Sequence, residues 1–332
     1  MQKILIFRTD RLGDFILTKE SLNYFFFSKE KFKVDMVVSK YIYEYAKYFK
    51  TINNFFIFDG SYLDFFQNHK KIFKKKYDYI LICDGKNRSH IISFFIKGKK
   101  ITFIKRKKNN KILEILNYDV IFNSEKKVQL KTYQGIYNKL NIKESIDTPF
   151  YFEYQFGNYK EIDLVPQNSL FFHFDEKWFK KYYINDFDTF DWTKGFFENF
   201  LAKLYNNIKL PIVITTGSKK IEFIEEIKSS FFYLKKNNIF FHNNYQNNVI
   251  FLDNLDFRNL EFVLKKKCKL LICNHGAISH LANNLGIKHF DFVQGTSEFM
   301  NKHWTGHMSN VNLILRADSK EDLLLKLEQI KY

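Results

Sequence analysis

Short apolar runs alternate with longer amphipathic runs along most of this 332-residue chain. Residues 79–82, Tyr-Ile-Leu-Ile, are apolar throughout, as expected of a strand that is buried on both faces of a sheet. Such strands separated by helices indicate βαβ crossovers, and therefore a parallel sheet. In the first half we predict strands at residues 3–7, 33–38, 54–58, 78–83 and 100–104, with helices at residues 15–27, 41–49, 62–75 and 89–96.

The same alternation restarts after an irregular stretch at residues 145–166, which we interpret as the interdomain linker. Residues 109–141 before it are predicted to be mostly helical, and Ser218, Asp256 and Ser319 are expected N-caps in the second half. We therefore predict an α/β protein with Rossmann-like domains at residues 1–155 and 167–316, followed by a terminal helix within residues 317–332. Strands of the second domain are predicted at residues 169–174, 211–215, 248–252, 269–273 and 289–293, with helices at residues 193–205, 218–234, 256–266, 281–285 and 319–330.

The chain is strongly basic, with 53 Lys and Arg against 36 Asp and Glu and a formal net charge of +17. A surface of that charge attracts nucleic acid, anionic lipid or phosphorylated substrates. Codon bias toward lysine in an AT-rich genome explains the same excess equally well. The basic runs at residues 74–76, 99–100, 105–108 and 265–267 are separated by apolar segments, so we interpret them as the ends of structural elements.

The cysteines and the apolar runs indicate the compartment. Cys83, Cys268 and Cys273 form no Cys-x-x-Cys pair, and their odd number argues against a disulfide framework. We therefore expect buried free thiols and a cytoplasmic protein. No apolar run approaches the ~20 residues that cross a bilayer, and the first residues lack the apolar core of a signal peptide. Any membrane contact is then expected to be peripheral.

The first candidate loop runs from Arg8 to Asp14 and follows the first predicted strand. Ligands of parallel sheets gather at the carboxyl ends of strands. Asp14 lies near the start of the next helix, where a carboxylate can act as a general base toward a hydroxyl, and Gly13 permits close backbone approach. Arg8 and Arg11 can hold a phosphate or carboxylate through paired hydrogen bonds. From residue type alone we favour a plainer role, in which Asp14 caps the helix and pairs with Arg8.

The second candidate loop runs from Asp84 to Ser89 after the fourth predicted strand. It combines Gly85 with two cations, Lys86 and Arg88, at the start of a helix. Free backbone N–H groups and positive charge at a helix start suit anion binding. A polar turn in which Ser89 caps the helix is an equally good interpretation.

The third candidate loop runs from His275 to His280, and the fourth comprises residues 294–297, Gln-Gly-Thr-Ser. In the third, small residues at a helix start can present backbone N–H groups to a phosphate, to which the two histidines can also donate. His280 packed beneath the turn is the structural alternative. The fourth loop is either a second phosphate loop or a solvated turn. A zinc site is not expected because no third ligand follows at a familiar spacing, and neither GxGxxG nor GxxxxGK[ST] occurs.

Together these loops resemble glycosyltransferase family 9, the ADP-heptose:lipopolysaccharide heptosyltransferases. Residues 3–18, KILIFRTDRLGDFILT, are similar to the family's N-terminal signature, an apolar strand followed by a Gly-Asp pair and Leu-Thr. Residues 77–89 are similar to its DLVIDLQG…RS strand and loop. Residues 270–295 resemble its donor-site strand, small-residue turn, His-Leu-Ala helix and Gly-Thr loop. The matches follow in order along nearly the whole chain.

The resemblance implies a glycosyltransferase B fold, with two Rossmann-like domains facing a cleft. The N-terminal domain is then expected to bind the acceptor and the C-terminal domain the sugar nucleotide, and the terminal helix is expected to return to the first domain. The implied reaction is inverting and needs neither a metal nor a cofactor, since the nucleotide-sugar is a co-substrate. Asp14 then becomes the general base. The implied acceptor is the anionic, lipid-linked inner core of lipopolysaccharide at the inner face of the cytoplasmic membrane, which suits the basic surface.

Some residues depart from the family pattern. Asn274 or His275 stands where the family has an Asp in the donor loop, Lys19 stands where it favours Pro, and its central region is represented only by residues 173–178. The donor can therefore differ from ADP-heptose. The residues carried over to the acceptor side are Arg8, Arg11, Asp84 and Arg88. Those carried over to the donor side are Lys177, Glu261, Asn274, His275, Gly276, Ala277, Ser279, His280, Gly295 and Thr296.

Two other functions compete with this hypothesis. One is a transferase of the same fold that uses another sugar nucleotide for a capsule or another surface glycan. The second is a non-catalytic basic protein that binds nucleic acid or an anionic membrane. A nucleic-acid binder needs base-stacking aromatics on a continuous positive face, whereas the aromatics here follow strand and helix patterns. We therefore expect no nucleic-acid partner.

Overall fold

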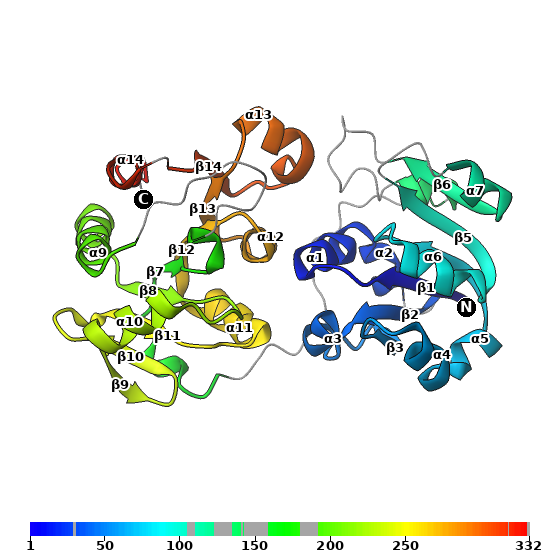
Figure 1. Cartoon of the computed structure of the whole chain (residues 1–332), viewed down its shortest axis with the longest axis horizontal. Helices are drawn as coiled ribbons and strands as arrows, with labels where there is room; N and C mark the ends of the chain where they lie inside the picture. The colour runs from blue at the N-terminus through cyan, green and yellow to red at the C-terminus, as the bar shows by residue number, and fades with distance from the viewer. Residues whose placement is uncertain are drawn as a thin grey trace. The chain divides into compact units, whose positions relative to one another are not determined.

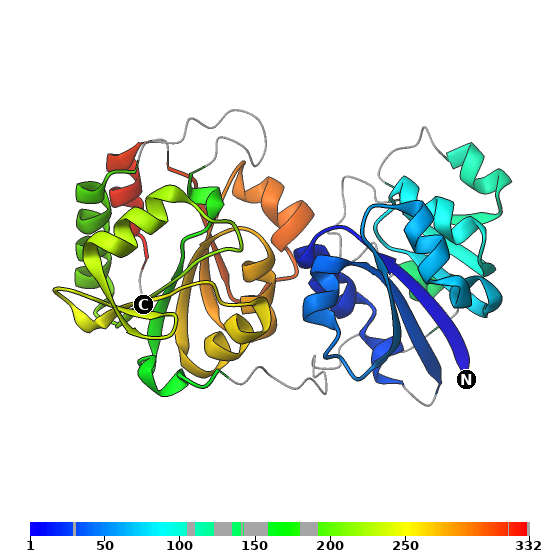
Figure 2. The same ribbon diagram turned by 60° about the horizontal axis from the view of Figure 1, so that its bottom comes forward.

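The computed structural model describes residues 1–28, 31–104, 110–122, 135–140, 142, 159–179, 192–317 and 319–330. The chain divides into two compact units, one of residues 1–155 with 301–307 and the other of residues 156–300 with 308–332. Each unit contains a sheet of mostly parallel strands with helices packed against it (Figures 1 and 2), which confirms the predicted pair of Rossmann-like α/β domains. The basic run at 105–108 and most of the expected linker lie outside the described residues.

The sheet of the first unit has the strand order β3-β2-β1-β4-β5-β6, and all neighbouring strands are parallel. The chain reverses its direction of progress across the sheet between β1 and β4, which makes these neighbours the topological switch point. Residues 135–139 are also helical. The strands are β1 (Gln2–Arg8), β2 (Phe32–Ser39), β3 (Ile52–Phe58), β4 (Lys76–Ile82), β5 (Lys97–Ile104) and β6 (Tyr118–Phe122). The helices are α1 (Leu12–Ser21), α2 (Asn23–Phe27), α3 (Lys40–Ala46), α4 (Tyr62–Asn68), α5 (Lys70–Lys74), α6 (Asn87–Phe94) and α7 (Asn110–Ile115).

The second unit repeats this topology and adds a hairpin at one edge. Its strand order is β14-β13-β12-β7-β8-β11-β10-β9, in which only β10 pairs antiparallel to its neighbours, and its switch point lies between β7 and β12. The strands are β7 (Ser169–His173), β8 (Ile212–Thr215), β9 (Phe232–Lys236), β10 (Ile239–His242), β11 (Gln246–Leu252), β12 (Cys268–Asn274), β13 (Lys288–Val293) and β14 (Val311–Leu315). The helices are η2 (Ile162–Leu164), η3 (Glu176–Trp178), α9 (Lys194–Ile208), α10 (Glu222–Phe231), α11 (Phe257–Lys267), α12 (Ala277–Asn284), α13 (Ser297–Met300) and α14 (Lys320–Leu327), whereas η4 (Asn301–Thr305) is counted with the first unit.

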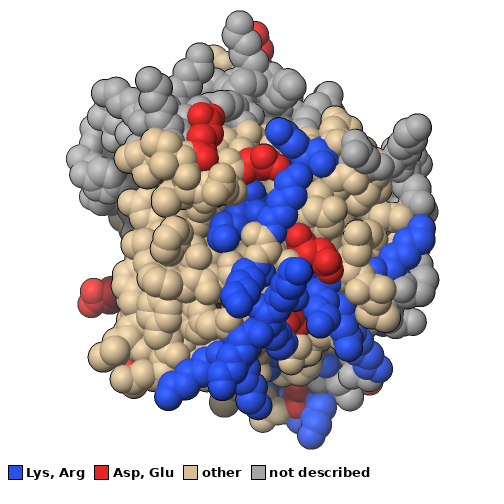
Figure 3. Space-filling view, turned by 90° about the vertical axis from the view of Figure 1, so that its right-hand side faces the viewer, with Lys and Arg blue, Asp and Glu red and all other residues tan. Residues whose placement is uncertain are grey.

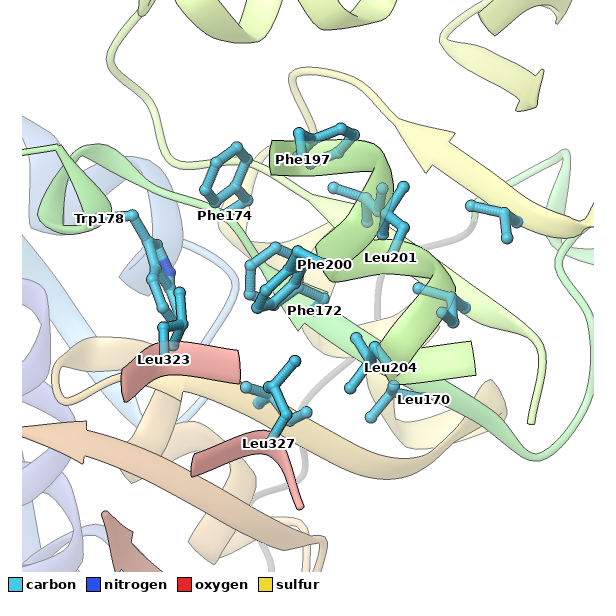
Figure 4. Packing of buried hydrophobic residues seen from close by; sticks show 14 of the residues in the cluster. Leu170, Phe172, Phe174, Trp178, Phe197, Phe200, Leu201, Leu204, Leu323 and Leu327 are labelled. Atoms are coloured by element: carbon cyan, nitrogen blue, oxygen red, sulfur yellow. The ribbon is translucent and has the colours of Figure 1, made fainter. Parts of the chain in front are cut away.

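Aromatic side chains fill the core of the second unit on one face of its sheet (Figure 4). Phe172 of β7 and Phe174, the residue after β7, project toward α9, where their rings lie 5.0 Å from Phe200 and 5.7 Å from Phe197, respectively, centroid to centroid. Trp178, just beyond β7, packs 5.1 Å from Phe172. Because such rings bury large apolar areas, this cluster fixes β7 and the turn behind it, which carries part of the site described below.

The C-terminal helix belongs to the second unit. Leu323 and Leu327 of α14 are fully buried in the same core and pack beside α9 (Figure 4). Ser319 caps the helix as predicted, because its hydroxyl accepts the amide of Asp322 at 3.1 Å. The expectation that this helix returns to the first domain is wrong, since its apolar stripe is already buried against the second sheet.

Several predicted element bounds are also wrong. The helix expected at residues 15–27 begins at Leu12 and breaks at Leu22 into α1 and α2. The helix expected at residues 218–234 is α10, whose N-cap is Ile221 and not Ser218. The strand β6 and the β9–β10 hairpin were not predicted; the hairpin turns at Asn237, which has a φ of 48°. The cap at Asp256 is confirmed by its bond to the amide of Asn259 at 2.8 Å.

The cysteines are free thiols, as predicted, and Cys83 and Cys273 are buried. Burial raises the pKa of the Cys83 thiol, so it stays protonated at neutral pH. Among the described residues no helix is both long and apolar enough to span a membrane.

Candidate functional site

Polar residues gather at the carboxyl edge of each sheet, at its switch point. In the first unit they follow β1 and β4, and in the second they follow β7 and β12. Parallel strands all end at the same edge, and loops that leave the two sides of a switch point diverge and expose backbone to a ligand. The two groups of residues are described separately.

The guanidinium of Arg8 is the centre of the first group. The residue ends β1 and is only 1% exposed. Its Nη1 donates to the carbonyl of Cys83 at the end of β4, at 2.5 Å. Its Nε lies 3.3 Å from Asp10 Oδ1, and its Nη2 lies 3.4 Å from Asp14 Oδ1. A buried cation thus ties the two strands together and faces two carboxylates.

The two carboxylates differ in environment. Asp10 is 15% exposed and Asp14 is 21% exposed. Burial raises the pKa of Asp10 to about 6, and the charges of Asp14 and Asp84 add to this, although Arg8 opposes it. Asp14 lies in the first turn of α1, whose N-cap is the exposed Arg11 without a side-chain cap. The structure therefore supports the predicted Arg8–Asp14 pair but not a capping role for Asp14, and it adds Asp10, which sequence reasoning missed.

Asp84 and Arg88 hold the two loops together. The carboxylate of Asp84 accepts four hydrogen bonds, from the amide and hydroxyl of Thr9, from the hydroxyl of Ser89 and from the amide of Lys86, at 2.7–3.2 Å. Arg88 donates to the hydroxyl of Thr9 at 2.6 Å and to its carbonyl at 2.8 Å. Both side chains, expected on the acceptor side, are thus engaged in fixing the loop that carries Asp10 and Asp14.

A buried carboxylate organises the second group. Asp291, on β13, is fully buried. It accepts hydrogen bonds from Ser279 Oγ at 2.7 Å, from Cys273 Sγ at 3.0 Å and from His275 Nδ1 at 2.8 Å. Burial pushes its pKa up, but the hydrogen bond and charge of His275 outweigh that effect, and the pKa lies well below its usual value. Asp291 is therefore an anion that joins the end of β12 to the start of α12.

Asp291 also fixes the orientation of His275. An ionised carboxylate can only accept, so Nδ1 of His275 carries the hydrogen and Nε2 lies on the opposite side of the ring. The side chain of His275 keeps 13% of its surface exposed. A carboxylate behind one ring nitrogen is the arrangement by which proteins position a histidine for use through the other nitrogen.

Lys177 covers the turn between β12 and α12. Its ammonium donates to the carbonyl of His275 at 3.0 Å and lies 3.6 Å from Asp175 Oδ2. A Cβ on Gly276 would overlap this ammonium, so the glycine leaves the space that Lys177 occupies. The turn therefore combines a lysine from the β7 side of the switch point with a histidine from the β12 side.

The backbone of this turn is only partly open. The amide of Gly276 donates to Ser279 Oγ at 3.1 Å, and the amides of Ser279 and His280 donate to the carbonyl of Gly276. Of the four amides predicted to face a phosphate, Gly276 to Ser279, two are thus used inside the turn. The first two residues of α12, Ala277 and Ile278, keep amides that the intrahelical pattern cannot satisfy.

Three predicted donor residues are buried. Glu261 is buried one turn into α11. His280 is 5% exposed, and its ring packs edge-on 5.3 Å from that of His275, as the structural alternative requires. Asn274 ends β12 with 3% exposure, and neither atom of its carboxamide finds a hydrogen-bond partner in the part of the chain that is described. Either this residue or His275 stands where the resembled family has an Asp.

The fourth loop follows β13 and shows the features of a helix-starting turn. Gly295 has a φ of 89°, which an L side chain rarely adopts, so the turn needs a glycine. The hydroxyl of Thr296 accepts the amide of Phe299 at 3.1 Å and thereby caps α13. Both residues are exposed. No cluster of three or more His, Cys, Asp or Glu able to hold a metal occurs among the described residues.

Known proteins match this chain in structure but not in sequence. No protein-family model and no curated protein sequence matches it. The structure of E. coli heptosyltransferase WaaC with ADP-2-deoxy-2-fluoro heptose has a TM-score of 0.65 at 13% identity, covering 98% of both chains. E. coli ADP-heptose lps heptosyltransferase II scores 0.66 at 13% identity, covering 99% of this chain and 98% of that one. A family 9 glycosyl transferase from Veillonella parvula DSM 2008 scores 0.65 at 12% identity, covering 95% and 86%. The chain therefore has the fold of these heptosyltransferases, and the predicted glycosyltransferase B class is confirmed.

Proposed function

We propose that this chain is a glycosyltransferase that moves a sugar, a heptose or a related one, from a nucleoside diphosphate to a hydroxyl of a surface-glycan acceptor. The observation that carries the proposal is the turn after β12, where Lys177, His275 and the first amides of α12 converge. Those groups suit the diphosphate of a sugar nucleotide, because each favours negative charge. E. coli heptosyltransferase WaaC, which shares the fold, has been solved with ADP and with ADP-2-deoxy-2-fluoro heptose, and this makes ADP-sugars the first donors to test.

In this mechanism the second unit stabilises the leaving group. As the bond between the anomeric carbon and the β-phosphate oxygen breaks, negative charge grows on the nucleoside diphosphate. Lys177 and the imidazole of His275 donate to that charge, together with the amides of Ala277 and Ile278. Groups that are fixed in advance around developing charge supply much of the rate in such reactions. The charge is neutralised here by side chains, so the proposal assigns no metal to the reaction.

The first unit supplies the base. Asp14 removes the proton from the acceptor hydroxyl as its oxygen attacks the anomeric carbon from the side opposite the diphosphate, so the configuration inverts. Arg8 holds Asp14 through the contact at 3.4 Å, and Asp10 and the Asp84–Thr9–Arg88 bonds hold Arg8 and the loop in place. Arg11 is exposed at the N-terminus of α1, and its proposed role is to orient an anionic acceptor such as a lipopolysaccharide core.

The test is a panel of nucleotide sugars with ADP, UDP and GDP as leaving groups, first by thermal shift and then by transfer to candidate acceptors. The expected result is that one donor stabilises the protein and is consumed only with an acceptor. Asp14→Asn should keep donor binding and lose transfer by about 100-fold or more, as the loss of a general base does. Asp59→Asn, at an exposed acid in the loop after β3, is the matched control. Transfer by Asp14→Asn near the wild-type rate contradicts the assignment, as does the absence of any nucleotide-sugar binding.

The same-fold alternative, another sugar nucleotide serving a capsule or another glycan, differs only in which member of the panel binds. Asn274 is the residue that can select a different sugar nucleotide. Its carboxamide has no partner among the described residues, whereas an aspartate at that place carries charge. A sugar nucleotide that both donates and accepts a hydrogen bond at this place would satisfy the carboxamide of Asn274.

A further inference from the structure

The positive charge of the chain is concentrated in its first unit. Residues 1–122 hold 25 Lys and Arg against 12 Asp and Glu, a formal net charge of +13 out of +17 for the whole chain. The carboxyl edge of the first sheet, however, holds Arg8 between Asp10 and Asp14 and is not a strongly positive site. The excess charge therefore lies elsewhere on this unit.

Part of the excess lies where the strands begin. In the register of the sheet, Lys3 of β1 is the neighbour of Lys33 of β2, and Lys76 of β4 is the neighbour of Lys97 of β5. All four are exposed, and none forms an ion pair with a described residue. Figure 3 views the end of Figure 1 at which the N-terminus lies, and Lys and Arg side chains crowd that face. Paired like charges on adjacent strands repel each other unless an anion lies over them.

Exposed apolar side chains lie at the same edge. The helices of the unit run back along the sheet, so α6 ends just before β5 starts, and α7 ends just before β6 starts. Phe94 at the end of α6 is 51% exposed, and Ile115 at the end of α7 is 78% exposed. We call the six residues Lys3, Lys33, Lys76, Lys97, Phe94 and Ile115 the amino-edge surface.

We propose that the amino-edge surface binds an anionic membrane. Apolar side chains that enter the interface and lysines that meet anionic headgroups are the two signals that together hold a protein on a bilayer, and each lysine adds about 1 kcal/mol. Nucleic acid fits less well. Ile115 has no aromatic face on which a base can stack, yet it is the more exposed of the two apolar side chains of the surface.

The proposal fixes where the acceptor reacts. Asp14 follows the carboxyl end of β1, and β1 has seven residues. At a rise of about 3.3 Å per residue, Asp14 lies roughly 20 Å from the edge that faces the bilayer. A lipid-linked acceptor must then project its reacting hydroxyl by about that distance, as a glycan of several sugars does. This consequence rests on the proposed function, but membrane binding itself does not.

The experiment is co-sedimentation of the full chain with vesicles of phosphatidylcholine alone and of phosphatidylcholine with 30% phosphatidylglycerol, without any nucleotide sugar. The expected result is binding to the anionic vesicles that falls as salt rises. Lys76→Glu/Lys97→Glu should weaken the partition at least tenfold, and Phe94→Ser/Ile115→Ser should weaken it severalfold. The matched control is Lys235→Glu/Lys236→Glu, which makes the same change of charge at two exposed lysines of β9 in the second unit.

The outcomes separate the proposals. Equal binding to both vesicles, no binding to either, or an equal loss in the β9 control overturns the amino-edge surface. The proposal is also overturned, in favour of nucleic acid, if single-stranded RNA binds the protein and competes it off the vesicles while Phe94→Ser/Ile115→Ser binds the RNA as tightly as the wild type does. Circular dichroism of each variant confirms that it folds. Because no sugar nucleotide is present, failure here leaves the transferase proposal intact, and failure of the donor panel leaves membrane binding intact.

Discussion

Asp10 provides a quantitative test of the first group of site residues. Its carboxylate is 15% exposed and faces Arg8, which also faces Asp14. The change Asp10→Asn keeps the size of the side chain and an oxygen that can accept from Arg8 Nε, and it removes one negative charge. It therefore mimics the protonated form of Asp10 in the folded protein.

The magnitude follows from the pKa, which burial raises from 3.8 to about 6. Each unit of pKa corresponds to about 1.4 kcal/mol, so ionised Asp10 destabilises the folded protein by about 3 kcal/mol at pH 8. Because folding raises this pKa, the folded state holds the proton more tightly, and stability is lost as the pH rises from 3.8 through 6. At pH 5 the native residue is largely protonated, and the same cost is about half as large.

Asp10→Asn should therefore stabilise the first unit by about 3 kcal/mol at pH 8 and by about half as much at pH 5. The assay is hydrogen exchange of the β1 amides, corrected for intrinsic rates, because it reports the opening of this unit without assuming that both units unfold together. Asp59→Asn is the control and should change the opening free energy by less than about 0.5 kcal/mol. A destabilised Asp10→Asn, or a stabilisation that does not change with pH, would refute the reasoning.

Three further changes test the second unit. Gly276→Ala should displace the ammonium of Lys177 and weaken nucleoside diphosphate binding about tenfold, which calorimetry measures. The melting temperature should change little in a thermal melt, because the displaced atom ends a flexible side chain. Asp291→Asn should lower the free energy of unfolding in urea by about 2 kcal/mol at any pH from 5 to 9. The groups that donate to Asp291 lose an anionic acceptor whose pKa lies far below that range, so a loss of stability that disappears at pH 5 would contradict the assignment. Ser319→Ala should cost about 1 kcal/mol through the lost cap of α14, and an unchanged stability would mean that the cap contributes nothing.

The fold was predictable from the sequence because its central strands are buried on both faces. Residues 79–82 and 170–172 have to be apolar throughout when helices cover both sides of a parallel sheet, and both lie in strands. The β9–β10 hairpin could not be predicted in this way. It forms the edge of the second sheet, where Leu234 is 58% exposed and the strand pattern is lost. For that reason the helix predicted at residues 218–234 extended into the first residues of β9.

The sites were predicted in part. Loops at the ends of strands drew attention to Asp14, His275 and Gly276, whose positions depend on local sequence. Asp10 and Asp291 were missed because their significance depends on burial and on partners distant in the sequence. Asp291 lies 16 residues from His275, and only the β12–β13 pairing brings the two together. An Asp inside an otherwise apolar strand, Phe290-Asp291-Phe292, was the one available signal.

The most direct test of the account is the affinity of the protein for nucleoside diphosphates, measured by calorimetry with ADP, UDP and GDP on the wild type and on Lys177→Ala. We expect one of the three to bind, and the loss of a charge-assisted contact to weaken that binding at least tenfold. Lys235→Ala, at an exposed lysine of β9, should leave the affinity unchanged. If no nucleoside diphosphate binds, or if Lys177→Ala binds as tightly as the wild type, the turn after β12 is not a diphosphate site.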